Sequence, residues 1–245
     1  MGSWTNTFDQ PIGFPVPDWT QRELPPRTAM TGRYCRVEPV SVERHAADLY
    51  AAYSEAPDGR DWTYLPTELP ADLAAYRDFL TRAAADHDRL HHAIVDLATG
   101  RAVGTAALMR ADPANGAIEV GYITYSPLLK RTRVGTEVMY LLMRRVFDEL
   151  GYRRYEWKCD SLNAASRAAA VRFGFRFEGV FRQAVVYKGR NRDTAWLSII
   201  DTEWPAVRAA FERWLAPENF GEDGRQLRGL AEIRGARDIS ESARP

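Results

Sequence analysis

The chain has 245 residues, of which 45% are hydrophobic and 27% charged, a composition typical of a soluble globular protein with one large domain or two small ones. Lys plus Arg and Asp plus Glu both number 33, and this balance argues against a protein that coats nucleic acid. Two cysteines make no disulfide framework, no apolar run is long enough to span a membrane, and the first residues lack a signal peptide's basic and apolar regions. We therefore expect a cytoplasmic protein without nucleic-acid or membrane partners.

The first 31 residues differ in composition from the rest of the chain and form a predicted extended arm (residues 1–31). Five prolines fix φ along this segment and interrupt regular pairing. Ile12, Phe14 and Val16, followed by Trp19, favour an arm that packs against a surface over a free tail. That surface belongs either to the chain itself or to a second copy, so a monomer and a homodimer both stay open.

The middle of the chain alternates between strand and helix patterns. Alternating residues predict a strand at 33–40, and Ser41 is a suitable N-cap for a helix that continues to about Ser54. Pro70 is expected to open a second helix, which continues to about Asp86 with apolar residues along one face. Three strands follow, at residues 91–97, 101–110 and 117–125.

The second half continues with a long amphipathic helix from about Thr132 to Gly151, where the glycine ends it. The remaining elements are a strand at 155–160, a helix at 163–173, strands at 175–187 and 194–200 around a basic turn at 188–193, and a helix at 202–215. This order predicts one α/β domain at residues 32–216, built around a single mixed sheet. Residues 217–245 form a tail that we expect to be mobile from Gly221 onward.

The stretch SPLLKRTRVGTEVMYLLMRRVF, which begins at Ser126, places three basic residues at the start of the long helix. Lys130, Arg131 and Arg133 oppose the helix dipole there, whereas residues that cap a helix N-terminus are more often acidic. The unpaired N–H groups of a helix N-terminus bind phosphate, and nearby cations strengthen this attraction. The pattern therefore favours a pyrophosphate site over a charged helix cap.

Two further stretches resemble the GNAT acetyltransferase superfamily. The sequence DSLNAASRAAAVRFGFRFEG is similar to the family's third signature region, and in particular to the RimJ/RimL type, which acetylates protein N-termini. The sequences EVGYITYSP and KRTRVGTE are similar to its fourth strand and its acetyl-CoA loop. The resemblance covers residues 32–202 and implies the GNAT (acyl-CoA N-acyltransferase) fold, an α/β fold with a mixed, mostly antiparallel sheet flanked by helices.

The resemblance implies acetyl-CoA as co-substrate and no metal. The cofactor is expected beside the fourth strand, where splaying from the next strand would admit the thioester and a backbone N–H could hold the developing oxyanion. The expected cofactor-binding residues are Ile123, Tyr125, Lys130, Arg131, Arg133, Val134, Gly135, Thr136 and Asn163. The family's loop has a glycine where this chain has Arg133. If Arg133 lies within the first helical turn, no positive φ is required there and its guanidinium is available to phosphate.

The same resemblance suggests catalytic groups. Ser166 is expected near the sulfur, where it could protonate the leaving thiolate, whereas Ala170 stands where many members have a tyrosine acid. Glu119 is the candidate base for the acceptor amine, with a salt-bridged strand residue as the alternative. Val185 stands where some RimL-like relatives have a carboxylate, so Tyr187 is a reserve candidate on the acceptor side.

Aromatic and imidazole side chains are open to more than one interpretation. Trp62 and Tyr64 lie where RimJ/RimL relatives build the acceptor pocket, although packing in an aromatic core explains them equally well. His87, His91 and His92 have no carboxylate or cysteine at ligand spacing, so a surface turn is favoured over a metal site.

The sequence thus predicts an N-acetyltransferase that moves acetyl from acetyl-CoA to a primary amine of a protein N-terminus or a small molecule. Transfer is expected by direct attack in a ternary complex, without an acetyl-enzyme on Cys159, which we expect in the core. Two alternatives are a non-catalytic acyl-CoA-binding module, suggested by the altered loop and by Ala170, and a scaffold without a cofactor site.

Overall fold

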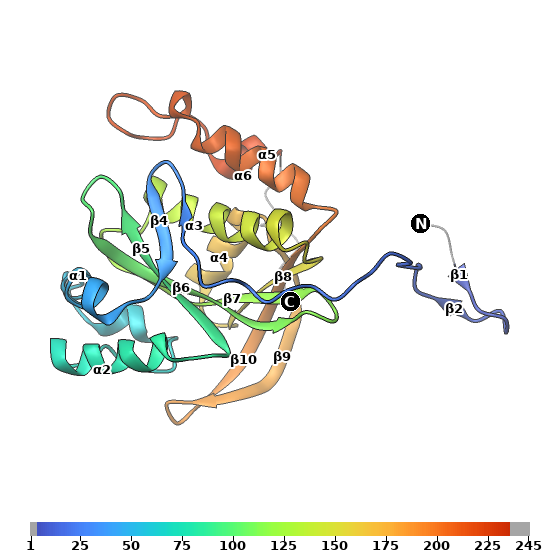
Figure 1. The fold of residues 1–245 in the computed structure, drawn as a ribbon, viewed down its shortest axis with the longest axis horizontal. Helices are drawn as coiled ribbons and strands as arrows, with labels where there is room; N and C mark the ends of the chain where they lie inside the picture. The colour runs from blue at the N-terminus through green and yellow to red at the C-terminus, as the bar shows by residue number, and fades with distance from the viewer. Residues whose placement is uncertain (1–3, 236–245) are drawn as a thin grey trace.

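The computed structural model describes residues 4–235 and contains one eight-stranded mixed sheet (Figure 1). The strand order is β3-β4-β5-β6-β7-β8-β10-β9, and β7–β8 is its parallel pair while the other neighbours run antiparallel. The strands span Met30–Thr31, Cys35–Pro39, Arg89–Asp96, Ala102–Asp112, Ala117–Tyr125, Arg154–Asp160, Arg176–Tyr187 and Arg190–Ile200, for β3 to β10. This architecture is the predicted mixed, mostly antiparallel sheet.

The parallel pair separates halfway along its length. Pairing between β7 and β8 runs from Ala117↔Arg154 to Val120↔Trp157 and then stops. Beyond that point β7 contains a bulge, because Tyr122 takes a positive φ of 48° and the register against β6 shifts by one residue. The carboxyl ends of the two central strands therefore diverge, as the resemblance implied.

Helices α1 (Val42–Ser54) and α2 (Leu73–Ala84) cover one face of the sheet (Figure 1). Ser41 caps α1 as predicted, since its hydroxyl accepts from the N–H of Arg44. The predicted start of the second helix at Pro70 is wrong. Asp72 is the N-cap of α2 and accepts from the N–H of Ala75 at 2.8 Å, so the side-chain cap determines the first turn.

Helices α3 (Arg133–Arg144), α4 (Ala164–Phe173) and α5 (Trp204–Leu215) cover the other face (Figure 1). The long predicted helix continues past α3 as a π-helical turn, η2 (Arg145–Glu149). The apolar stripe of α3 enters the main core, where Val138, Met139 and Leu142 are fully buried. The limits of α4 are confirmed, with Asn163 as N-cap and Gly174 at a φ of 108° as C-cap.

The last two strands form a hairpin that is tighter than predicted. The basic turn expected at 188–193 consists of Lys188 and Gly189 alone, both at positive φ, and β10 begins at Arg190. Two consecutive left-handed residues match the twist of a two-residue hairpin, so the strands extend almost to each other. β9 is the free edge of the sheet.

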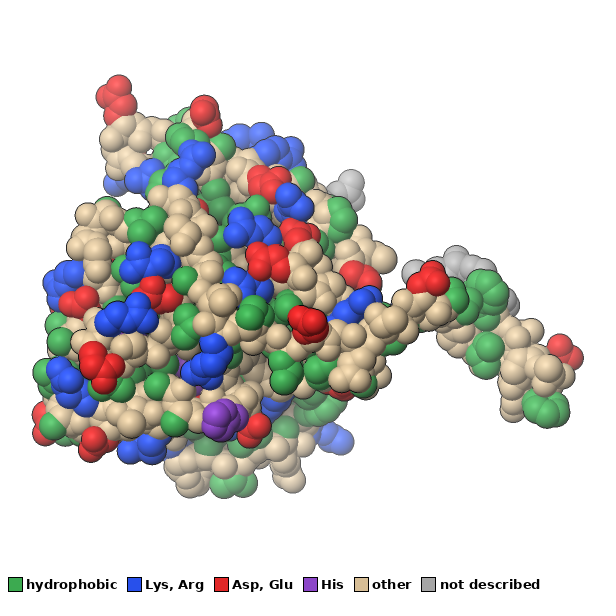
Figure 2. Space-filling view, viewed as in Figure 1, with side chains coloured by type: hydrophobic (Ala, Val, Ile, Leu, Met, Phe, Trp, Pro, Cys, Tyr) green, Lys and Arg blue, Asp and Glu red, His purple; other side chains and the backbone are tan. Residues whose placement is uncertain are grey.

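The N-terminal arm has two parts. Trp19 donates from its indole N–H to the carbonyl of Ala114 at 2.7 Å, and the following residues run along the body of the domain. The preceding part contains the short pair β1 (Trp4–Thr5) and β2 (Pro11–Ile12) and projects outward (Figures 1 and 2). Its apolar side chains, among them Phe8 and Phe14, are exposed.

Part of the predicted tail is folded. Residues 217–235 form η3 (Pro217–Asn219), a loop and α6 (Leu230–Arg234), and Leu230 is 1% exposed against the main core. The expectation of a mobile tail therefore does not describe this stretch. Residues 236–245, the rest of that predicted tail, lie outside the described residues, as do residues 1–3 of the arm.

Candidate active site

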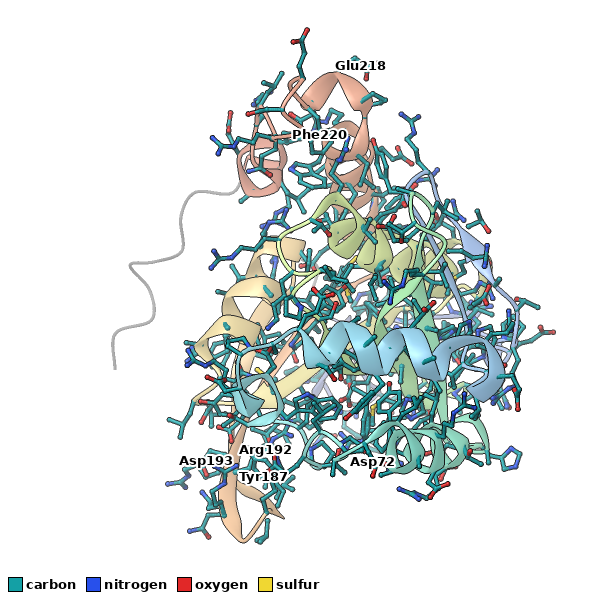
Figure 3. All side chains as sticks on the ribbon, turned by 90° about the vertical axis from the view of Figure 1, so that its left-hand side faces the viewer. Asp72, Tyr187, Arg192, Asp193, Glu218 and Phe220 are labelled. Atoms are coloured by element: carbon teal, nitrogen blue, oxygen red, sulfur yellow. The ribbon has the colours of Figure 1, made fainter. Side chains whose placement is uncertain are left out.

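A single large cleft, of about 1830 Å³, opens along the diverging ends of β7 and β8. Its lining includes the β7–α3 loop, the start of α4, the β9–β10 hairpin and the C-terminal segment after α5. Figure 3 shows the two ends of the lining, with Phe220 on the C-terminal segment and Tyr187 and Arg192 on the hairpin far from it. We call these the Phe220 end and the Tyr187 end.

The β7–α3 loop (residues 126–132) delivers a helix N-terminus to the cleft. Thr132 is the N-cap of α3, and its hydroxyl accepts from the N–H of Gly135 at 3.0 Å. Within residues 4–235, no group accepts from the backbone N–H of Arg131, Arg133 or Val134. Such N–H groups at the positive end of a helix dipole constitute an anion site.

Arg133 is the first residue of α3 and has an ordinary helical backbone. The positive φ of the loop falls on Arg131, at 60°. The missing family glycine therefore imposes no strain at Arg133. Its guanidinium lies between two aromatic rings, 4.9 Å from the centroid of Tyr34 and 4.8 Å from that of Phe220. The stacking leaves the edge of the guanidinium available to an anion.

Lys130 lines the same cleft but is held by an ion pair with Asp61, in the 3₁₀ turn η1 (Gly59–Trp62). Arg131 and Arg133 also line the cleft, and in the described part of the chain neither has a carboxylate within ion-pair distance. Two uncompensated cations next to free N–H groups favour a ligand with more than one negative charge, such as a pyrophosphate.

Gly135 lets the helix start approach the sheet. A Cβ at this position would lie 2.8 Å from the carbonyl oxygen of Leu129 and 3.1 Å from the Tyr125 ring. The Tyr125 hydroxyl donates to the Gly135 carbonyl at 2.9 Å, which fastens the loop to β7. Ile123 and Thr136 also line the cleft, whereas the Val134 side chain packs against the core.

Arg172 on α4 lines the cleft near the start of α3, and the sequence analysis did not identify it. It donates to the Thr136 hydroxyl at 3.2 Å and its guanidinium lies 5.2 Å from the Trp214 ring centroid. Burial lowers the pKa of Arg172, and the nearby Arg234 adds to this effect. In the part of the chain described, no carboxylate pairs with it. The C-terminal segment that brings Trp214 and Phe220 here has no local motif that could have predicted this contact.

The start of α4 forms the middle of the cleft. Asn163 accepts from the N–H of Ser166 at 3.0 Å, and the Ser166 hydroxyl accepts from the Trp157 indole N–H at 2.9 Å. Both side chains line the cleft. Cys159 also lines it and is 6% exposed, and burial raises the pKa of its thiol. A neutral buried thiol is a poor nucleophile.

Glu119 lies on β7 at the Tyr187 end and is 4% exposed. Its Oε2 atom is 3.0 Å from Arg110 Nη1 and 3.0 Å from Lys158 Nζ. Lys158 also pairs with Glu156 at 2.8 Å, so the four groups form one network across β6, β7 and β8. The negative charge of Glu119 is thus neutralised by two cationic partners within the protein.

Of the aromatic candidates, Trp62 lies in the core, whereas Tyr64 and Tyr187 line the cleft. Trp62 is 4% exposed and packs edge-on against Tyr53, with ring centroids 5.6 Å apart. It belongs to the core between the sheet and helices α1 and α2. Tyr64 and Tyr187 line the cleft, and the Tyr64 hydroxyl donates to the Leu162 carbonyl at 3.2 Å.

The residues present fit a coenzyme A thioester. Free N–H groups and unpaired arginines stand at one end of the cleft, and the diverging strands give an extended chain access to the interior. Over residues 4–235, no three His, Cys, Asp or Glu side chains gather as a metal site would require. No helix in that range has both the length and the apolar character to cross a membrane.

Comparisons with known proteins agree with this geometry. The family description "Acetyltransferase (GNAT) domain" matches residues 36–176. A GCN5-related N-acetyltransferase structure from Brucella melitensis is 49% identical, covers 90% of this chain and 100% of its own, and has a TM-score of 0.88. A GNAT-family structure from Chromobacterium violaceum is 39% identical, with coverages of 80% and 98% and a TM-score of 0.74.

More distant structures share the fold alone. A Vibrio cholerae structure named as a ribosomal-protein-serine acetyltransferase is 17% identical, with coverages of 72% and 99% and a TM-score of 0.62. A comparison with curated proteins finds no match. The matched domain covers more than half of the chain and the Brucella structure aligns over nearly all of it, so this protein belongs to the GNAT acetyltransferase family and is an acyltransferase.

Proposed function

We propose that this protein transfers the acetyl group of acetyl-CoA to a primary amine of a protein N-terminus or a small molecule. One observation carries the proposal. A single cleft joins a helix N-terminus flanked by unpaired arginines to the opening between β7 and β8. The first feature suits the phosphates of coenzyme A, and the second suits its extended pantetheine arm.

Acetyl-CoA supplies an acetyl group already activated as a thioester. Arg131, Arg133 and the N–H groups at the start of α3 are proposed to hold its pyrophosphate. Lys130 contributes less, because Asp61 already neutralises it. Arg172, beside the first turn of α3, is proposed to contact a further phosphate. Ile123, Tyr125 and Asn163 line the path toward the diverging strands and are proposed to border the pantetheine.

Transfer is proposed to occur by direct attack of the amine. Ser166 accepts a hydrogen bond from Trp157, so its own hydroxyl acts as a donor, and it is proposed to donate toward the leaving sulfur. Cys159 is kept as a neutral thiol by burial, so it gives no basis for an acetyl-enzyme. The amine must lose a proton before attack, since an α-amine has a pKa of about 7.7–8.0 and a lysine of about 10.4. Glu119 is the sequence-based candidate for this base.

The acceptor class is the finer part of the proposal. The RimJ/RimL resemblance favours a protein N-terminus, and the name of the Vibrio cholerae structure refers to acetylation of a ribosomal protein. A small amine is the other candidate, because a cleft closed by the hairpin and the C-terminal segment could enclose one.

Calorimetric titration with acetyl-CoA, followed by an acceptor panel, tests the function. We expect acetyl-CoA to bind with a micromolar Kd. We also expect release of free coenzyme A thiol when one of two probe amines is added, either a hexapeptide with a free N-terminal serine or spermidine. Intact-mass analysis during turnover should show unmodified enzyme, and accumulation of an acetyl group on Cys159 would contradict direct attack. Binding without release of thiol across the panel would support the acyl-CoA-binding module, which Ala170 in place of a tyrosine acid suggests.

A further inference from the structure

The carboxylates of the cleft differ in how their charge is neutralised. Three acidic side chains line it within the described residues: Asp61, Glu119 and Asp160. Asp61 pairs with Lys130, and Glu119 is held by two cations at 3.0 Å each. Asp160 alone of these three has no cation within ion-pair distance in residues 4–235.

Asp160 is buried at the point where the central strands have separated. It is the last residue of β8, three positions beyond the final β7–β8 pair at Trp157, and it is 5% exposed. Its Oδ2 atom accepts from the Tyr187 hydroxyl at 2.9 Å, and its Oδ1 atom accepts from the N–H of Leu162 at 2.9 Å. Two neutral donors compensate a buried carboxylate only in part.

A buried carboxylate in this condition favours a cationic ligand. An ammonium group brought to Asp160 would supply the missing positive charge and gain a charge-assisted hydrogen bond. Glu119 offers less to such a ligand, because two cations in direct ion-pair contact already neutralise it, whereas no cation in residues 4–235 is within ion-pair distance of Asp160. The Tyr187 end of the cleft therefore contains one carboxylate suited to an amine and one that is already satisfied.

We propose that Asp160, with the Tyr187 hydroxyl as its positioning partner, binds the acceptor's ammonium group and accepts its proton. This inference rests on the proposed acetyl transfer. Of the two protons that the ammonium loses, the first goes to Asp160 and from there to solvent, which frees the nitrogen lone pair. The C–N bond then forms as the C–S bond breaks, and the second proton neutralises the leaving thiolate.

The surroundings of Asp160 are consistent with this role. Burial raises the pKa of Tyr187, and the hydrogen bond and charge of Asp160 raise it further, so the hydroxyl stays protonated and donates a hydrogen bond to the carboxylate. Arg190 and Arg192 from β10 are the cations that act on Tyr187, and Arg192 with Arg167 from α4 act on Cys159, the residue before Asp160 on β8. None of these cations is within ion-pair distance of Asp160 in residues 4–235.

Asp160 also closes a turn before α4, so a merely structural role must be separated from an acceptor site. Asp160→Asn retains the Oδ1 acceptor for Leu162 and removes the charge. Tyr187→Phe removes one hydroxyl from a half-buried side chain and leaves the turn intact. Glu119→Gln is the competing variant and not a neutral control, because it neutralises the sequence-based candidate base at the same end of the cleft.

The experiment measures three quantities for each variant: the acetyl-CoA Kd by calorimetry, the unfolding midpoint, and the pH profile of kcat/KM with the faster of the two probe amines. For Asp160→Asn we expect an acetyl-CoA Kd within about twofold of wild type and a kcat/KM lower by about 100-fold at pH 7, a usual contribution of a general base. The fall of kcat/KM at low pH that is due to the enzyme's base should be absent in this variant. Tyr187→Phe should shift the pH of that fall and lower kcat/KM by about tenfold.

Each other outcome overturns the proposal. Wild-type kinetics in Asp160→Asn, with the loss in Glu119→Gln, would assign the base to Glu119. If Asp160→Asn unfolds or loses acetyl-CoA, an unchanged pH profile in Tyr187→Phe would reduce the pair to a structural contact. Acetyl-CoA binding by wild type without turnover of either probe would remove the proposed function itself, and an absence of acetyl-CoA binding would remove the cofactor site as well.

Discussion

The two ends of the cleft differ in the charges that they offer to a ligand. At the Phe220 end, three arginines face the cleft without a carboxylate partner in the described chain: Arg131, Arg133 and Arg172. At the Tyr187 end, most charges are paired, as in the Glu119 network, and the charges without an ion-pair partner in the described chain are of both signs, Asp160 and Arg192. The first end therefore suits an anionic ligand, whereas the second offers an amine one buried carboxylate, Asp160, that no cation pairs with in the described chain.

The ends also differ in how far apart their residues lie in the sequence. The helix start at the Phe220 end comes from one contiguous stretch, Arg131 to Thr136, which a motif can reveal. The Tyr187 end combines Tyr64, Glu119, Asp160 and Tyr187 from four separate elements. Four predictions test whether each end depends on the contacts assigned to it.

The largest expected effect concerns the support of the Phe220 end. Glu137, the fifth residue of α3, accepts from the backbone N–H groups of Arg33, Tyr34 and Cys35 at 2.7, 2.7 and 2.8 Å. Glu137→Ala leaves three backbone donors without an acceptor, one of them buried, and should lower the free energy of unfolding by about 3 kcal/mol. Urea denaturation measures this, with Glu55→Ala, at an exposed glutamate, as a control that should change stability by less than about 1 kcal/mol. A loss in Glu137→Ala as small as in the control would contradict a structural role for this carboxylate.

Charge reversal at the helix start should have the next largest effect. Arg133→Glu replaces an unpaired cation with an anion beside the proposed pyrophosphate, and acetyl-CoA should bind at least roughly 30-fold more weakly, or about 2 kcal/mol. Calorimetric titration measures this. The matched control is Arg110→Gln at the Tyr187 end, which should leave the acetyl-CoA Kd unchanged because Arg110 faces Glu119 instead. An equal loss of acetyl-CoA affinity in both variants would contradict the assignment of the cofactor phosphates to the Phe220 end.

Local chemistry explains what the sequence could predict of the fold. The limits of α4 depend on Asn163 and Gly174, whose capping and left-handed geometry are properties of single residues. The start of α2 was missed because Pro70 and Asp72 are both acceptable first-turn signals, and the hydrogen bond from Ala75 selects Asp72. The predicted hairpin turn is longer than the observed one because Lys188 takes a positive φ, which the residue type lysine does not indicate.

The residues of the candidate site divide in the same way into those that a local motif can predict and those that it cannot. Loop residues such as Arg133 and Gly135 could be placed from the motif, and the structure brings them to the cleft. Asp160, Arg172 and Phe220 could not, because their relevance depends on tertiary contacts with Tyr187, Thr136 and Arg133 respectively. No spacing rule links a strand end to a hairpin 27 residues later.

A pH effect is expected from β5, which supports the Tyr187 end. Burial lowers the pKa of His91 to about 4 and that of His92 to about 3, and the His91 ring packs edge-on against Tyr122 of the cleft at 5.2 Å. The unfolded chain binds these protons at a pKa of about 6.5, so stability is complete above that pH and falls as the pH drops toward the folded values.

The variant His91→Gln tests this linkage. Each buried histidine should contribute about 2 kcal/mol to the difference in unfolding free energy between pH 8 and pH 5. His91→Gln should reduce that difference by about 2 kcal/mol, measured by urea denaturation at both pH values. The exposed His87→Gln should leave it unchanged. A stability that stays constant between pH 8 and pH 5 would show that these imidazoles are not buried as neutral groups.

The smallest expected effect returns to the Phe220 end and asks whether the C-terminal segment contributes to binding. Phe220→Ala removes one of the two rings that hold the Arg133 guanidinium and leaves Tyr34 in place. One cation–π contact contributes about 0.5–1 kcal/mol at a partly exposed site, so acetyl-CoA should bind roughly two- to fivefold more weakly. Phe8→Ala, in the projecting arm, is a control of the same chemistry without a cleft contact. Because Arg133→Glu removes the charge and Phe220→Ala only its support, the double variant should be no weaker than Arg133→Glu alone, and a further loss would mean that Phe220 contacts the cofactor itself.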